Sequence, residues 1–162
     1  DLELLFSSQP FVSGSSGQFS YIKPNLSQEI DLSDEEDGLI LFEIPDEYTS
    51  KNVLVEVIGA GQRDTVAIYS NQLEVQFSER YGSLAVREET SGDAVSKAYV
   101  KVYAKKKGGA VRFFKDGYTD LRGKFDYTSL STNELDSVET LSLMVMSEEN
   151  GSLVREIAPP QR

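Results

Sequence analysis

The 162-residue sequence contains no cysteine, no histidine and no tryptophan. The chain therefore has no disulfide, no thiolate nucleophile, no Cys/His zinc or iron site, and no imidazole, the commonest general base of enzymes. Carboxylate pairs of the glycosidase kind stay open, because nothing in the sequence sets the separation of two acids. We expect no catalytic residues, no metal site and no enzyme activity.

Long apolar runs and positive net charge are also missing. No stretch approaches the ~20 apolar residues of a membrane-spanning helix. Sixteen basic residues against 27 acidic ones give a net charge of −11, a field that opposes nucleic acid and anionic lipid. The chain begins at Asp1 without a leader-like segment, so we expect any targeting peptide to be removed or to lie outside it. These features predict a soluble domain with no nucleic-acid partner and no direct membrane insertion.

The first 38 residues differ in composition from the rest. Short apolar bursts at 2–6 and 19–22 are separated by a stretch rich in Ser, Gly and Pro. This pattern is typical of strands joined by a flexible linker, and it predicts an extended arm over 1–38 and a body over 39–162. The acidic run from Glu29 to Asp37 lacks the residue order of a calcium loop, so we expect a solvated loop, with calcium as the alternative.

The body alternates between strand-like runs and turn residues. Val100, Val102 and Ala104 alternate with polar and aromatic side chains, and Asn150-Gly151 is a strong hairpin signal. One segment, 131–139, has helical character. The sequence predicts an all-β fold, an antiparallel β-sandwich of the immunoglobulin or transthyretin-like kind with an extended N-terminal strand arm and at most one short helix. The body can also be divided into two halves, 39–90 and 91–162. Strands are expected at 39–44, 53–58, 65–69, 73–77, 84–87, 95–104, 110–115, 141–147 and 153–157.

The segment from Ser91 to Thr128 resembles the transthyretin-like, carboxypeptidase-regulatory type of β-sandwich. The resemblance is carried by GDAVSKAYVKV at 92–102 and YTDLRGKFDY at 118–127. In this motif Asp120 closes a turn, Gly123 supplies a positive φ, and Phe125 enters the core. The resemblance implies an accessory module of a secreted or surface protein. The whole sequence, with its arm and the run FKDGY at 114–118, is also similar to filament-forming surface glycoproteins of aquatic microbes.

The arm is a candidate for assembly between subunits. An extended segment of this kind can add a strand to a neighbour's exposed sheet edge, and a contact that does not close on itself makes a filament. The alternative is that the arm folds back as the first strand of its own sandwich. The candidate assembly residues are Leu2, Leu4, Leu5, Phe6, Phe11, Phe19 and Tyr21.

Basic residues are concentrated between Lys97 and Lys124. This stretch has nine basic and two acidic residues, a net charge of +7, while the remainder carries −18. Complementary charges on one molecule favour a head-to-tail contact. The alternative is a solvated strand face on which lysines protect an edge. The candidate basic patch consists of Lys101, Lys105, Lys106, Lys107 and Arg112.

Asn25 and Asn150 lie in the sequons Asn-Leu-Ser and Asn-Gly-Ser, so they are candidate glycosylation sites. Together these features favour an extracellular or cell-surface glycoprotein that polymerises with itself into a filament by strand addition. No cofactor is expected beyond N-linked glycans. The alternative is a monomeric accessory or ligand-binding β-sandwich module of a larger cell-surface protein.

Overall fold

The computed structural model describes residues 2–11, 23–31, 41–128 and 134–160. Strands dominate these residues, which also contain one α-helix and two single-turn 3-10 helices. The elements are α1 (Leu2–Ser8), η2 (Asp46–Tyr48), β1 (Val53–Gly59), β2 (Gln62–Ile68), β3 (Leu73–Ser78), β4 (Ser83–Glu88), β5 (Tyr99–Lys106), β6 (Val111–Tyr118), β7 (Lys124–Asp126), η3 (Leu135–Ser137), β8 (Val138–Ser147) and β9 (Gly151–Ile157).

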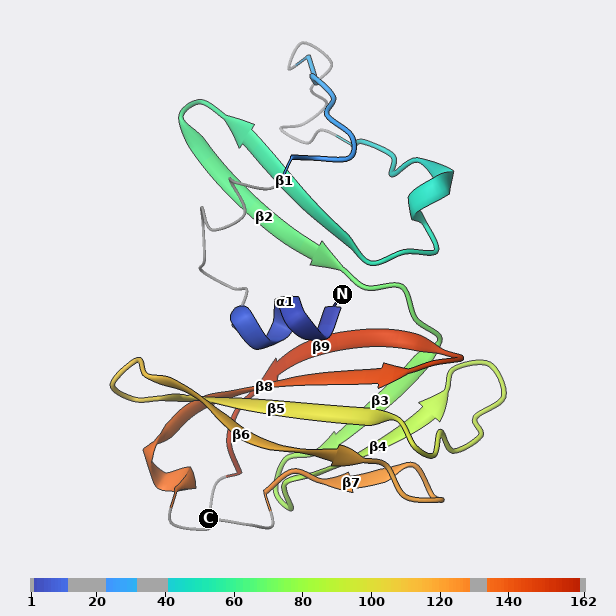
Figure 1. The fold of residues 1–162 in the computed structure, drawn as a ribbon, viewed down its shortest axis with the longest axis vertical. Coiled ribbons are helices and arrows are strands. Elements are labelled where there is room, and N and C mark those ends of the chain that lie inside the picture. Colours follow the sequence, from blue (N-terminus) through green and yellow to red (C-terminus); the bar gives the residue numbers. More distant parts are fainter. Residues whose placement is uncertain (1, 12–22, 32–40, 129–133, 161–162) are drawn as a thin grey trace.

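Seven of the strands form a sandwich of two antiparallel sheets (Figure 1). One sheet has the order β3-β4-β7 and the other has the order β6-β5-β8-β9. Their facing sides share one apolar core, in which Val86 of the first sheet and Leu143 of the second are fully buried. This two-sheet architecture is that of immunoglobulin-like sandwiches, and it confirms the predicted fold class.

The alternation of side chains along β5 sets which face enters the core. Val100 and Val102 are 0% exposed and Ala104 is 3% exposed, whereas Tyr99 and Tyr103 face the other side and are half-buried. Successive strand residues point to opposite faces, so one apolar row is enough to fix this orientation. The predicted alternation is confirmed.

The turns expected from the sequence form as predicted. Residues 148–150 form the turn between β8 and β9, with Gly151 beginning β9 at φ +84°, and the segment after Gly117 turns on Asp120. The Asp120 carboxylate accepts hydrogen bonds from the backbone N–H groups of Arg122 and Lys124, each at 2.8 Å. Gly123 has φ +71°, and Phe125 is 8% exposed in the core. The motif at 118–127 therefore acts as expected, although this local chemistry does not distinguish one sandwich family from another.

Strands β1 and β2 form a separate two-stranded sheet, which Figure 1 shows projecting away from the sandwich. Val55 pairs with Val66 and Val53 pairs with Ile68 on one face of this hairpin. That face, with Phe42, borders an open apolar groove of about 340 Å³. The hairpin therefore leaves apolar side chains exposed, among them Val66 at 54% and Ile68 at 40%.

The N-terminal arm differs from the expectation. Leu2–Ser8 form an α-helix instead of an extended strand, because an apolar run this short does not by itself select a strand and the helix packs Phe6 against Tyr103 of the sandwich. Residues 41–44 are not a strand, and the predicted helix at 131–139 is reduced, among its described residues, to the single turn η3. The expected boundary at residue 38 lies outside the described residues, and the division into halves stays a prediction.

Candidate interaction face

The four-stranded sheet carries an unusual set of side chains on its side facing away from the core, which we call the outer face. Cross-strand partners share a face, so the register places aromatic residues of β5 and β6 beside both methionines of the chain on β8. Aromatic and methionine side chains are typical of protein-binding surfaces. The outer face includes Tyr99, Lys101, Tyr103, Phe113, Asp116, Tyr118, Ser142, Met144, Met146, Ser152, Val154 and Glu156.

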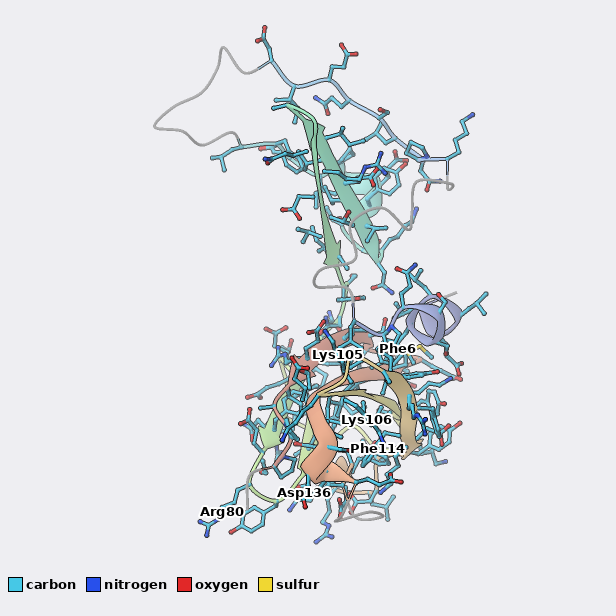
Figure 2. The ribbon with its side chains drawn as sticks, turned by 90° about the vertical axis from the view of Figure 1, so that its left-hand side faces the viewer. Phe6, Arg80, Lys105, Lys106, Phe114 and Asp136 are labelled. Atoms are coloured by element: carbon cyan, nitrogen blue, oxygen red, sulfur yellow. The ribbon has the colours of Figure 1, made fainter. Side chains whose placement is uncertain are left out.

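Helix α1 covers part of the outer face. Phe6 is 2% exposed and meets the Tyr103 ring edge-on, with 5.5 Å between the ring centroids. Tyr103 in turn meets Phe113 edge-on at 5.9 Å. Met144 is 0% exposed although it points away from the core. Figure 2 shows Phe6 where α1 meets the sheet.

Polar contacts fix both ends of the α1 segment. The Glu3 Oε1 atom lies 3.0 Å from the Lys101 Nζ atom, and the Lys101 side chain is 15% exposed. The Ser142 hydroxyl, which is fully buried, donates a hydrogen bond to the Pro10 carbonyl. These contacts join residues about a hundred positions apart in the chain, so α1 is part of the tertiary structure of the sandwich.

The rest of the outer face is open. Tyr99 and Tyr118 lie 5.4 Å apart between ring centroids, and Tyr118 is 65% exposed. The Tyr99 hydroxyl donates to Asp116 Oδ2 at 2.8 Å. Partial burial, together with this hydrogen bond to a carboxylate, raises the pKa of Tyr99. Phe113, at the edge of the covered part, is 53% exposed.

The predicted basic patch separates into two parts. Lys101 is engaged with Glu3 under α1. The other four, which we call the basic tip, lie at the end of the β5–β6 hairpin: Lys105, Lys106, Lys107 and Arg112. The tip is held by hydrogen bonds from Gly109 N–H to the Lys106 carbonyl at 2.7 Å and from Lys107 N–H to the Ser137 carbonyl at 3.0 Å. Among the described residues none forms a salt bridge with these four side chains.

The other predicted site residues do not converge on one place. Leu2, Leu5 and Phe11 are half-buried, and Leu4 is 72% exposed on the solvent side of α1. Asn25 is exposed and Asn150 is half-buried in the β8–β9 turn. Phe19 and Tyr21 lie outside the described residues. The described segment 2–11 of the arm thus docks on the chain's own sheet, with α1 on the face of that sheet.

Within the described ranges no helix is long and apolar enough to cross a membrane. No group of three or more acidic side chains that can hold a metal ion occurs in the part of the chain that the structure describes. Part of the acidic run at 29–37 lies outside that part, so the calcium alternative stays untested.

The sequence alone did not predict that the side chains of the outer face form one surface. The alternation in β5 and β6 placed Tyr99 and Tyr103 outward, but it gave no reason to connect them with Met144, more than 40 residues later. The available signal was the run 143–146, in which four successive residues are apolar without alternation. Such a run indicates a strand that is covered on both sides.

Comparisons with known proteins identify relatives of both parts of the chain. A family model described as the AbpF C-terminal domain matches residues 72–162, and one described as the AbpF seventh immunoglobulin-like domain matches residues 1–55. The sequence is 41% identical over 160 residues to Actin-binding protein F of Dictyostelium discoideum, a match covering 99% of this chain and 7% of that protein. The chain thus spans a small part of that relative's length. No solved structure matches.

These matches correct several expectations. The sandwich is immunoglobulin-like, and the transthyretin-like type is not supported. The predictions of an extracellular location, a glycoprotein and a self-assembling donor-strand filament are wrong, because the relative is an actin-binding protein with immunoglobulin-like domains. The fold-level resemblance misled here, since one sandwich architecture serves many unrelated functions. The reading as a module of a larger protein is the one the matches favour.

Proposed function

The chain belongs to the AbpF C-terminal domain family, and on this premise we propose that it is an immunoglobulin-like module of a larger cytoskeletal protein and that its partner is actin. The observation that carries the proposal is the 41% identity to Actin-binding protein F across nearly the whole chain. That name describes a protein of which this chain matches 7%, so the assignment of actin to this part is our own step. The module has no catalytic role in this proposal.

The basic tip is the surface we assign to this contact. Lys105, Lys106, Lys107 and Arg112 gather positive charge on a chain whose net charge is −11. A local charge of opposite sign to the rest of the molecule selects an acidic region on the partner and orients the approach. Because the tip's backbone is tied to η3, its side chains project from a fixed hairpin end.

Co-sedimentation with filamentous actin tests the proposal. The purified chain is expected to pellet with filaments and to remain in the supernatant without them. Binding should weaken as salt rises from about 50 to 200 mM, because added salt screens the attraction between the exposed basic side chains and an acidic surface. The Debye length is about 10 Å at 0.1 M and shortens as salt is added. Replacing Lys106, Lys107 and Arg112 by Glu together is expected to weaken binding about tenfold or more.

A matched control carries the same change in net charge elsewhere. Lys51, Arg80 and Lys124 are exposed and lie outside the tip, and Arg80 is labelled at the far corner of the sandwich in Figure 2. Replacing these three by Glu is expected to leave binding within about twofold of the original. A chain that does not pellet at low salt refutes actin binding by this module. Equal losses in both triple variants refute the basic tip as its site.

A further inference from the structure

Phe6 is the anchor of α1 on the outer face. Its ring is 2% exposed, it meets Tyr103 edge-on, and it lies outside the core cluster between the two sheets. The ring thus packs on the outward side of the sheet and not between the two sheets. The outer face therefore holds a site for one aromatic side chain.

The polar contacts of α1 determine which helix positions lie over which residues of the sheet. Glu3 pairs with Lys101, and Phe6 follows three positions later on the same side of the helix. The Pro10 carbonyl then accepts a hydrogen bond from Ser142. The face thus recognises an acidic side chain followed at helical spacing by an aromatic one.

Helix α1 is a weak occupant of this site. As a separate peptide, the seven residues Leu2–Ser8 are too few for a stable helix, so a peptide of this segment gains its helical form from the contacts with the sheet. One ring is buried, whereas Leu4 on the same helix is 72% exposed. The Glu3–Lys101 pair is partly exposed to solvent, where ion pairs contribute little.

The apolar surface continues beyond α1. Tyr99, Tyr118 and Met146 share the outer face with Lys101, and the Tyr118 ring is 65% exposed. A longer amphipathic helix docked in the same register covers both the Phe6 site and this open part. We infer that the outer face of the four-stranded sheet binds an amphipathic helix of a partner protein, with an acidic residue three positions before an aromatic one, and that α1 occupies this site as a displaceable internal ligand.

This inference goes beyond the proposed function and does not depend on it. Actin is assigned to the basic tip, whereas the helix site uses Tyr103, Met144 and Lys101. Because α1 is tethered, it competes at a high effective concentration, and a partner helix must bind more tightly than α1 does. The two sites are separable by variants that affect one and leave the other intact.

The test uses the full chain and a synthetic peptide of residues 1–11 as the probe. Phe6→Asp places a charge against the Tyr103 ring and is expected to release α1. In NMR titrations of this variant the peptide should shift amide signals around Tyr103 and Met144, with an apparent Kd at least tenfold lower than for the original chain. Leu4→Asp is the matched control: it adds the same charge to the exposed side of α1 and should bind the peptide as weakly as the original chain.

A charge reversal tests the register. Lys101→Glu, added to the Phe6→Asp chain, should weaken peptide binding, and a peptide carrying Glu3→Lys should restore it. A folded Phe6→Asp chain that does not bind the peptide overturns the inference. So does an original chain that binds it equally well.

Amide exchange in the original chain provides a second measurement that needs no variant. If α1 is displaceable, its amides exchange at least a hundredfold faster than those of β5 and β8, which form the centre of the sheet. Protection of α1 equal to that of β5 overturns the inference, because the helix then opens only when the whole sandwich unfolds.

Discussion

At the scale of single residues, Gly123 occupies a turn in which a side chain has no room. Its φ is +71°, and a Cβ atom there would lie 2.3 Å from the Val86 carbonyl oxygen. Gly92 has nearly the same φ, +74°, but open space around it. Both Ala variants suffer the left-handed strain of roughly 1–2 kcal/mol, and only Gly123→Ala adds the clash.

We therefore expect Gly92→Ala to lower the free energy of unfolding by about 1 kcal/mol and Gly123→Ala to lower it by about 3 kcal/mol or more. Urea unfolding followed by circular dichroism measures both. Equal losses in the two variants would show that the backbone at Val86 shifts away from the added Cβ atom without lowering the free energy of unfolding.

Tyr127 buries a hydroxyl group that has no hydrogen-bond partner among the described residues. Tyr127→Phe removes this unsatisfied group, so we expect the free energy of unfolding to rise by about 1 kcal/mol at pH 7. Burial, with smaller contributions from the Glu79 and Asp126 carboxylates, raises the pKa of Tyr127 to about 12.

The raised pKa of Tyr127 predicts a loss of stability in alkali. An unfolded tyrosine has a pKa near 10, so between about pH 10 and 12 the unfolded chain loses this proton while the folded chain keeps it. Stability then falls as pH rises, by roughly 2–3 kcal/mol from this group. Tyr127→Phe should flatten that part of the profile, whereas Tyr81→Phe, whose ring is 74% exposed, should not. The pKa values of the half-buried Tyr69 and Tyr99 are also raised, and they contribute in the same direction in both variants.

At the scale of elements, the strands that separate core from solvent were predictable from the sequence. In β5 the alternation of Val100 and Val102 with Tyr99 and Lys101 reports directly which side is buried. The turn before Gly151 and the Asp120–Gly123 turn form at residues whose local backbone chemistry favours turns. These local features were enough to predict the sandwich architecture from the sequence.

The elements that depend on distant contacts were not predictable. Leu2–Phe6 is an apolar run too short to distinguish strand from helix, and it becomes α1 because of Tyr103 and Lys101, about a hundred residues away. Ser142 and Met144 are buried on the outward side of β8, where Ser142 donates a hydrogen bond to the Pro10 carbonyl, just after α1. The candidate interaction face therefore emerges only when the fold brings these segments together.

At the scale of the whole molecule, the chain combines a seven-stranded sandwich with a two-stranded hairpin that shares neither sheet with it. The match to the AbpF C-terminal domain begins at residue 72, just before β3, and the match to the seventh immunoglobulin-like domain ends at residue 55, within β1. The sandwich has a closed core, while β1 and β2 expose much of their apolar face. An isolated two-stranded hairpin is marginally stable in water, so the two parts should differ in stability.

This difference predicts that the apolar face of the hairpin can be altered without affecting the sandwich. Replacing Val66 and Ile68 by Thr keeps two β-branched strand formers and makes the exposed face polar. We expect the fluorescence of an apolar dye bound to the chain to fall by at least half, with the midpoint of thermal unfolding within about 2 °C of the original, because distant sites act independently. Leu121→Thr, at an exposed leucine on the sandwich, is the control and should change the dye signal little. A shift of the unfolding midpoint by several degrees in the Val66 and Ile68 variant would mean that the hairpin and the sandwich unfold as one cooperative unit.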